Sequence, residues 1–220
     1  MKVSLISYSQ PSAELQAQGI TDAQELVAYC ARVSNPSNQH NTETSEKLIR
    51  YLIKHGHWSP LEMVSVCLEI ETTRDIARQI LRHRSFSFQE FSQRYAVADV
   101  EFENREARLQ DTTNRQNSIA TEDEALKKHW LKQQQQVQAY ARSAYQWALA
   151  RGIAKEQARA VLPEGMTASR LYMQGTLRSW VHYVELRSAN GTQLEHRNVT
   201  LACANAIKPI FPMISDFLAK

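Results

Sequence analysis

The chain has 220 residues, of which 43% are hydrophobic and 22% charged, proportions typical of a folded domain rather than a disordered chain. Its formal net charge of +3 is too small for a protein built mainly to bind nucleic acid. No run reaches the roughly 20 apolar residues of a membrane helix, and the start MKVSLISYSQ has no signal-peptide pattern. The sequence therefore predicts one domain over residues 1–220 without nucleic-acid or membrane partners, in the cytoplasm, or in a host's cytoplasm if the source is viral.

In the first eighty residues the spacing of apolar residues changes several times between two and three to four. A period of two predicts strands, and a spacing of three to four predicts helices. We expect strands around Val3–Leu5 and over 64–70, and helices over 21–33, over 44–55 and from Thr73 onward.

The second half of the chain is mainly helical in pattern. Alternation at Asp99–Glu103 indicates a short strand within the irregular stretch 95–121. Helices are expected over 122–150, around Arg159 up to Pro163, over 167–187 and over 193–208. The sum is an α+β domain, with a small and mostly antiparallel sheet packed against several helices.

The cysteines and histidines do not form a metal site. Cys30, Cys67 and Cys203 stand among apolar or small neighbours and include no CxxC pair, which favours buried structural thiols. The seven histidines lack the spacing of zinc ligands, so we predict no metal.

Cationic and polar side chains gather between Arg78 and Tyr95. If the helix continues, Gln79, Arg82 and His83 share one face, while Arg84 follows the apolar face and requires an anion or a subunit interface. A solvated basic helix end would explain the same charges. Nucleic-acid binding with stacked aromatic rings is another alternative, and its candidates are Phe86, Phe88 and Phe91.

The order of residues in this segment resembles a known signature. Arg82-His83-Arg84, then Ser87, Glu90, Ser92, Arg94 and Tyr95, resembles RHRxxSxNExSxRY of the flavin-dependent thymidylate synthases, with Gln89 at the usual Asn. ARVSNP at 31–36, HWSPLE at 57–62, QARAVLP at 157–163 and LRSWVHYVELR at 177–187 are similar to other stretches of that family. The resemblance extends from about residue 25 to 200, and RLQDTTNRQNS at 108–118 resembles an insert of some members.

The resemblance implies the fold of that family and its reaction, the reductive methylation of dUMP to dTMP in de novo dTMP biosynthesis. It implies FAD as cofactor, methylene-tetrahydrofolate and NADPH (or NADH) as cosubstrates, and a homotetramer whose flavin sites are shared between subunits. Matching positions for dUMP are Gln79, Ile80, Leu81, Arg82, Glu90, Phe91, Ser92, Gln93, Arg94, Arg159 and Arg187. Matching positions for FAD are Ser59, Arg82, His83, Arg84, Glu90, Thr176, Arg178 and His182, with Ser34, His57, Glu62 and Gln89 as further candidates.

Arg187 is the expected catalytic residue. By the resemblance, Ser92 and Arg94 lie near the phosphate, and Gln79 and Arg187 near the pyrimidine. A guanidinium that keeps its charge can stabilise negative charge developing on the ring. Arg187 could also be a helix-terminal arginine interacting with the helix dipole. Two other functions remain open, a flavoprotein acting on a different nucleotide and a structural subunit with a decayed site.

Overall fold

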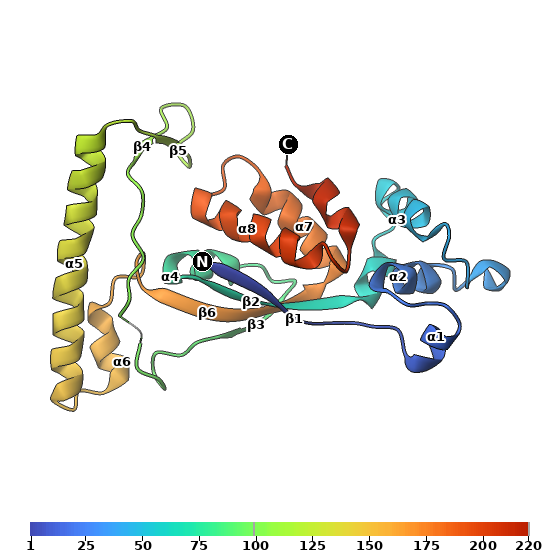
Figure 1. Ribbon diagram of the computed structural model, residues 1–220, viewed down its shortest axis with the longest axis horizontal. Helices are drawn as coiled ribbons and strands as arrows, with labels where there is room; N and C mark the ends of the chain where they lie inside the picture. Colours follow the sequence, from blue (N-terminus) through green and yellow to red (C-terminus); the bar gives the residue numbers. More distant parts are fainter. Residues whose placement is uncertain (99, 220) are drawn as a thin grey trace.

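The structure, a computed structural model, describes residues 1–98 and 100–219. Its centre is a four-stranded antiparallel sheet in the order β1-β2-β6-β3. Helices α4, α7 and α8 lie on one side of this sheet (Figure 1). The elements of this central body are β1 (Lys2–Tyr8), β2 (Ser65–Thr73), α4 (Arg74–Ile80), β3 (Ser87–Glu90), β6 (Ala168–Thr176), α7 (Leu177–Ser188) and α8 (Leu194–Ile207).

Smaller groups of elements extend from both ends of the central body. One end carries α1 (Ala13–Ala17), α2 (Ala23–Ala31), η1 (Pro36–Asn38), α3 (Ser45–Lys54) and η2 (Ser59–Met63), and η4 (Pro212–Phe217) follows α8. The other end carries β4 (Arg108–Gln110), β5 (Ser118–Ala120), α5 (Glu124–Ala150), α6 (Lys155–Ala158) and η3 (Arg159–Val161). The predicted α+β class is confirmed, and no helix in the described ranges is both long and apolar enough to cross a membrane.

The main core lies between the sheet and helices α4, α7 and α8. Alternate residues of β2 and β6 face it, and the register pairs Leu68 with Met173. The indole nitrogen of Trp180 on α7 donates to the carbonyl oxygen of Val66 at 3.1 Å, which ties the helix to the central strand. Burial of this interlocking apolar face is the main force that stabilises the domain. Its fully buried members include Val66, Leu68, Ile70, Ile76, Ile80, Leu171, Met173, Leu177, Val181, Val184 and Val199.

Most predicted helices are confirmed, but the helix predicted over 167–187 is wrong in its first half. Residues 168–176 form strand β6, and the helix starts only at Leu177. Ser169 and Gly175 occupy two of the inward positions of β6 and gave no apolar signal. Thr176 then ends the strand and caps α7, because its hydroxyl oxygen accepts from the backbone nitrogen of Ser179 at 3.3 Å.

The prediction of a strand at 99–103 is also wrong for most of that stretch. Phe102 forms only an isolated bridge with Thr167, and Asp99 lies outside the described residues. Strands β3, β4 and β5 and helix α1 were not predicted, because each has at most five residues and too little apolar periodicity.

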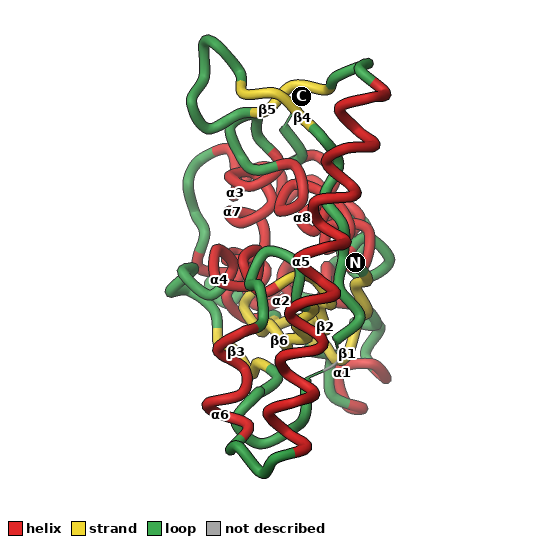
Figure 2. The backbone as a smooth tube through the Cα atoms, turned by 90° about the vertical axis from the view of Figure 1, so that its left-hand side faces the viewer, coloured by secondary structure: helices red, strands yellow, loops and turns green. Residues whose placement is uncertain are grey.

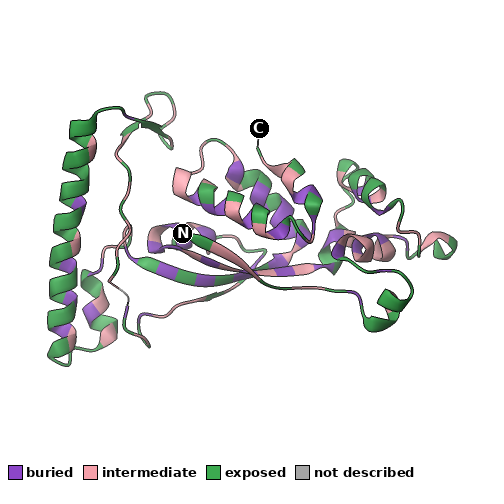
Figure 3. Ribbon diagram, in the orientation of Figure 1, coloured by how far each residue is buried: buried purple, intermediate pink, exposed green. Residues whose placement is uncertain are grey.

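Helix α5 forms a separate arm. Figure 1 shows it apart from the sheet, and Figure 2 shows the β4–β5 hairpin near one of its ends and α6 beside the other. Buried Gln134 attaches it to the preceding segment, since its side-chain oxygen accepts from the backbone nitrogen of Arg105 at 2.7 Å and its nitrogen donates to the Arg105 oxygen at 2.9 Å. Most of the helix surface remains exposed (Figure 3).

Candidate functional site

The turn that follows α4 brings the arginine-rich segment against α7. Because the helix ends at Ile80, the prediction that Arg84 lies on its apolar face is wrong, and Arg82 and Arg84 are both exposed. Phe86 instead enters the core, where its ring packs on Trp180 at 4.9 Å between centroids. Burial of Phe86 removes a main candidate for base stacking, which argues against the nucleic-acid alternative.

Arg187 and His83 form a pair at the centre of this turn. The Arg187 Nε donates to His83 Nε2 at 2.9 Å, across the space between α7 and the turn. Burial, and then the charges of Arg187 and Arg82, lower the pKa of His83 to about 4. At neutral pH the imidazole is therefore uncharged, and its Nε2 orients the guanidinium while the two terminal nitrogens can bind a ligand.

Gln79 lies in a second polar group beside this pair. Its side-chain oxygen is 3.2 Å from His196 Nδ1, and its nitrogen donates to Gln193 Oε1 at 2.7 Å. His196 Nε2 is 3.0 Å from the Tyr183 hydroxyl. These three partners, Gln193, His196 and Tyr183, are not among the residues predicted from the sequence. His196 could have been identified from the sequence, because it is a polar residue at a position where the 3.6-residue spacing of α8 requires an apolar one.

Ile80 and Leu81 of the predicted nucleotide set differ from their polar neighbours. The Ile80 side chain is fully buried in the core, and Leu81 is partly buried at the end of α4. Any contact of Ile80 with a nucleotide would therefore have to use its backbone.

Glu90 is held at the other end of β3. Its carboxylate accepts from Ser169 Oγ at 2.8 Å and from Arg78 Nη1 at 3.3 Å, and the buried Arg74 guanidinium lies 3.8 Å away. Glu90 pairs in register with Leu171, five residues before Thr176. At 3.3–3.4 Å per residue, this places Leu171, and Glu90 beside it, about 17 Å from Thr176.

A further group surrounds the segment after β3. The Arg94 guanidinium lies 3.4 Å from the Glu156 carboxylate, and Arg159 Nε donates to the Glu156 carbonyl oxygen at 3.3 Å. Ser92 Oγ accepts from the Arg94 backbone nitrogen at 3.3 Å. Gln93 is only 3% exposed, and its amide nitrogen has no hydrogen-bond partner among the described residues. An unsatisfied buried donor is costly unless a ligand or a subunit supplies an acceptor. Phe91, also predicted for dUMP, is partly buried and donates its backbone nitrogen to Arg170 O at 2.9 Å.

The predicted flavin residues gather mainly where η2 meets α7. Arg178 forms an ion pair with Glu62, and the His182 ring packs on Trp58 at 4.5 Å between centroids. Ser59 starts η2, and Thr176 caps α7. Glu90 is distant from this group within one chain, as the strand register shows. Ser34, His57 and Gln89 are exposed outside this arrangement.

These residues offer the chemistry that a flavin dinucleotide requires. The exposed guanidiniums of Arg82, Arg84 and Arg178 suit a pyrophosphate. His182 and Trp58 add aromatic surface beside Arg178. The residues present therefore fit the group.

The cysteines are not suited to nucleophilic catalysis. Burial raises the pKa of Cys30, Cys67 and Cys203, and Cys203 is fully buried on α8. Since the thiolate is the reactive form, these side chains remain as unreactive thiols at neutral pH.

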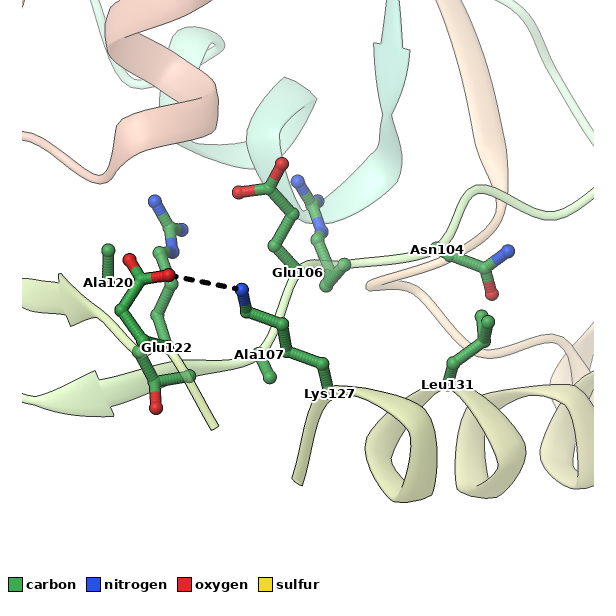
Figure 4. Close-up of a pocket in the computed structure, with 10 residues that line it drawn as sticks. Asn104, Glu106, Ala107, Ala120, Glu122, Lys127 and Leu131 are labelled. Atoms are coloured by element: carbon green, nitrogen blue, oxygen red, sulfur yellow. Dashed lines mark ion pairs between the residues drawn. The ribbon is translucent and has the colours of Figure 1, made fainter. Parts of the chain in front are cut away.

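The cavities of the arm do not coincide with the predicted residues. One of about 430 Å³ lies between the hairpin and α5, and Figure 4 shows Lys127 directed toward Glu122 across it, at 3.9 Å. Another of about 410 Å³ lies between the hairpin and the start of α8, and Gln193 and Arg197 line it. The predicted nucleotide and flavin residues instead form separate groups on the surface of the central body and beside α6.

Comparison with known proteins defines the class of this domain. The structure superposes with a TM-score of 0.82 on the UMP/dUMP methylase PolB from Streptomyces cacaoi bound with 5-Br dUMP, at 25% identity, covering 98% of this chain and 93% of that one. The sheet and its covering helices therefore have the fold of that nucleotide methylase. The profile of the thymidylate synthase complementing protein family matches residues 17–213.

Curated relatives place the chain more narrowly. It is 47% identical over 218 residues to a probable flavin-dependent thymidylate synthase of Paramecium bursaria Chlorella virus 1, covering 99% of both chains. It is also 47% identical over 218 residues to the flavin-dependent thymidylate synthase of Synechocystis, again over 99% of both. The chain belongs to the family of flavin-dependent thymidylate synthases, which confirms the resemblance seen in the sequence.

Proposed function

We propose that this protein is an enzyme that methylates dUMP reductively to dTMP, with FAD as cofactor. The observation that carries the proposal is the Arg187–His83 pair beside Gln79, in a chain that shares nearly half of its residues with flavin-dependent thymidylate synthases over its full length. Methylene-tetrahydrofolate is the proposed carbon donor, and NADPH or NADH the proposed reductant. Reduced flavin, when bound, supplies the hydride.

Arg187 is the proposed catalytic residue. His83 orients its guanidinium through Nε and leaves the two terminal nitrogens for the pyrimidine. A fixed positive charge at that place stabilises negative charge that develops on the ring when its C5 attacks the one-carbon unit, which lowers the barrier rather than merely improving binding. Cys203 is buried and Cys30 and Cys67 are partly buried, and burial raises the pKa of all three thiols. Activation by positioned charge is therefore the alternative to a covalent enzyme–nucleotide bond.

The remaining nucleotide residues have separate roles. Gln79 is proposed to bind the pyrimidine edge, and Arg94, Arg159 and Ser92 the phosphate. Among the described residues no histidine or carboxylate accepts from the Ser92 hydroxyl, which accepts from the Arg94 backbone nitrogen. Without such a base Ser92 is proposed to bind the phosphate by hydrogen bonding rather than to act as a nucleophile. Gln93 adds a donor that lacks a partner in the described chain.

The site is proposed to be completed by other copies of the chain in a homotetramer. In Figure 1, α6 lies beside α5 beyond the end of the sheet, whereas α7 lies over the sheet. The residues around Arg94 that are proposed for the phosphate and those around Arg187 that are proposed for the pyrimidine therefore lie apart within one chain. A single nucleotide can contact both groups if they come from different subunits. The same arrangement would bring Glu90 of one subunit to the flavin group at Arg178 of another.

Flavin content tests the cofactor part of this proposal. The purified protein should be yellow, and denaturation should release FAD at about one molecule per chain. Refolded or stripped protein should take up added FAD. A colourless protein that does not bind added FAD would exclude the proposed reaction.

A further inference from the structure

Hydrogen bonds link the buried core to Gln79 and continue beyond it. The Tyr183 hydroxyl lies 3.0 Å from His196 Nε2, and His196 Nδ1 lies 3.2 Å from Gln79 Oε1. Gln79 Nε2 is 2.7 Å from Gln193 Oε1, and Gln193 Nε2 is 2.9 Å from Glu195 Oε2. Five side chains of α4, α7 and the start of α8 therefore form one continuous relay, which we call the Gln79 relay.

The Glu195 end determines the direction of every bond in the Gln79 relay. Arg108 donates to its carboxylate at 2.6 Å, and Arg105 Nη1 lies 3.7 Å away. Burial acts to raise the pKa of Glu195, but hydrogen bonds from its own backbone and Gln193 and the charges of Arg105 and Arg108 outweigh burial and lower it. An ionised carboxylate only accepts, so Gln193 must direct its amide nitrogen to Glu195 and its oxygen to Gln79.

The same requirement propagates to Tyr183. Gln79 must donate from its nitrogen to Gln193 and direct its oxygen to His196, which must donate from Nδ1 and accept at Nε2 from the Tyr183 hydroxyl. Burial, and then the charges of Arg187 and His83, lower the pKa of His196 to about 3, so it carries one ring proton at pH 7. Reversal of any single amide would place two donors or two acceptors in contact.

We propose that the Gln79 relay locks the Gln79 amide in one orientation, and that the locked amide selects uracil over cytosine. The inference rests on the proposed function, in which Gln79 binds the pyrimidine edge. The half-buried amide retains one N–H and one acceptor position, which match the O4 acceptor and the N3–H donor of uracil. Cytosine presents the reverse pattern, an amino donor and the N3 acceptor, so a locked amide meets it with like groups.

A free glutamine would not discriminate in this way. It could rotate its amide by 180° and pair with either base. His196, Gln193 and Glu195 therefore act as positioning residues, since each fixes the direction of Gln79 through a neighbour.

The test compares the binding of dUMP and dCMP to the FAD-loaded full-length protein by calorimetry. Wild type should bind dCMP about 100-fold more weakly than dUMP, as expected for a site whose polar groups are mismatched. In Gln193→Met the new side chain has a similar length but cannot make the hydrogen bonds to Gln79 and Glu195. The ratio of the two dissociation constants should therefore fall about tenfold. The matched control is Gln138→Met, which removes an amide that donates to Asn104 Oδ1 at 2.8 Å on the α5 arm and should leave the ratio unchanged.

A second variant keeps the proposal testable if Gln193→Met does not fold. In Glu195→Gln, Arg108 and Arg105 hold the amide oxygen, so the amide nitrogen faces Gln193 and favours the opposite direction of the relay. The ratio of the two dissociation constants should therefore also fall. If Gln193→Met does not retain FAD, the ratio of the dCMP and dUMP dissociation constants in Glu195→Gln tests the proposal. Equal binding of dUMP and dCMP by wild type, an unchanged ratio in the variants, or equal weakening of both nucleotides would each overturn the lock. Wild type that binds no dUMP at all would overturn the proposed function itself.

Discussion

The guanidinium of Arg187 is oriented before any ligand binds. Its Nε is used by neutral His83, so the two nitrogens that remain point away from that bond in one plane. A lysine has no Nε–H to donate to His83 and carries its charge at a single atom. The proposed chemical role of Arg187 therefore depends on the shape of the guanidinium as much as on its charge.

Arg187→Ala should lower the rate of dTMP formation by about 100-fold or more, the size of loss seen when a preorganised charge or donor is removed. Arg187→Lys should remain well below wild type. FAD content should persist in both variants, because Arg178 and His182 remain. Rates are measured at saturating dUMP, folate and NADPH.

A matched control is Arg151→Ala. Arg151 is exposed at the end of α5, where its guanidinium lies 4.4 Å from the centroid of the Trp147 ring. Its loss should leave the rate within about twofold of wild type, since surface changes outside a site have small effects. An Arg187→Ala enzyme that turns over as fast as this control would make Arg187 structural.

At this scale the sequence predicted the members of the site better than their neighbours. Gln79, His83 and Arg187 were predicted from the resemblance to the family, and the structure brings His83 and Arg187 into contact. The positioning residues Tyr183 and His196 come from α7 and α8, and only the packing of these helices against α4 brings them to Gln79. The predicted position of Arg84 on the apolar face was wrong, because the helix ends at Ile80 and Phe86, not Arg84, enters the core.

Strand β6 is the element on which the site is built. It is paired on both sides, by β2 and β3, and leads directly into α7. Its prediction as a helix failed because Gly175 and Ser169 replace apolar residues at inward positions. Gly175 has a packing reason: a Cβ there would lie 2.6 Å from Phe86 Cε1.

Gly175→Ala should therefore destabilise the protein by about 1–3 kcal/mol, because the methyl group displaces a buried ring that has little space to move. The Phe86 ring also lies against Trp180 and Tyr183, so flavin affinity should fall with stability. The free energy of unfolding in urea measures the effect. Gly165→Ala is the control, since its Cβ would meet nothing within 4 Å and its φ is not left-handed, and it should stay within about 0.5 kcal/mol of wild type. Equal stability of the two variants would show that the Phe86 contact is not limiting.

The whole molecule is extended, and its shape agrees with assembly. The α5 arm exposes large aromatic side chains, with Tyr140 79% and Trp147 53% exposed. The predicted nucleotide and flavin residues form separate groups that no single chain brings together. The resemblance implies flavin sites shared between subunits, but it could not indicate which contacts one chain supplies, because a motif specifies residue types and not the copy of the chain that carries each of them.

The FAD-loaded protein should have a mass of four times the 25.2 kDa chain in light scattering. Removal of FAD should weaken the assembly if the flavin sites lie between subunits. A monomeric mass for protein that retains FAD and activity would contradict the shared site.

The central claim is the conversion of dUMP to dTMP, and the most direct measurement is chromatography of the nucleotide product. Purified protein is incubated with FAD, dUMP, methylene-tetrahydrofolate and NADPH, with single omissions as controls. We expect dTMP to accumulate over many turnovers in the complete mixture and to be absent when dUMP, the folate or the reductant is omitted. No dTMP from flavin-loaded, tetrameric protein, or equal dTMP without the reductant, would contradict the account.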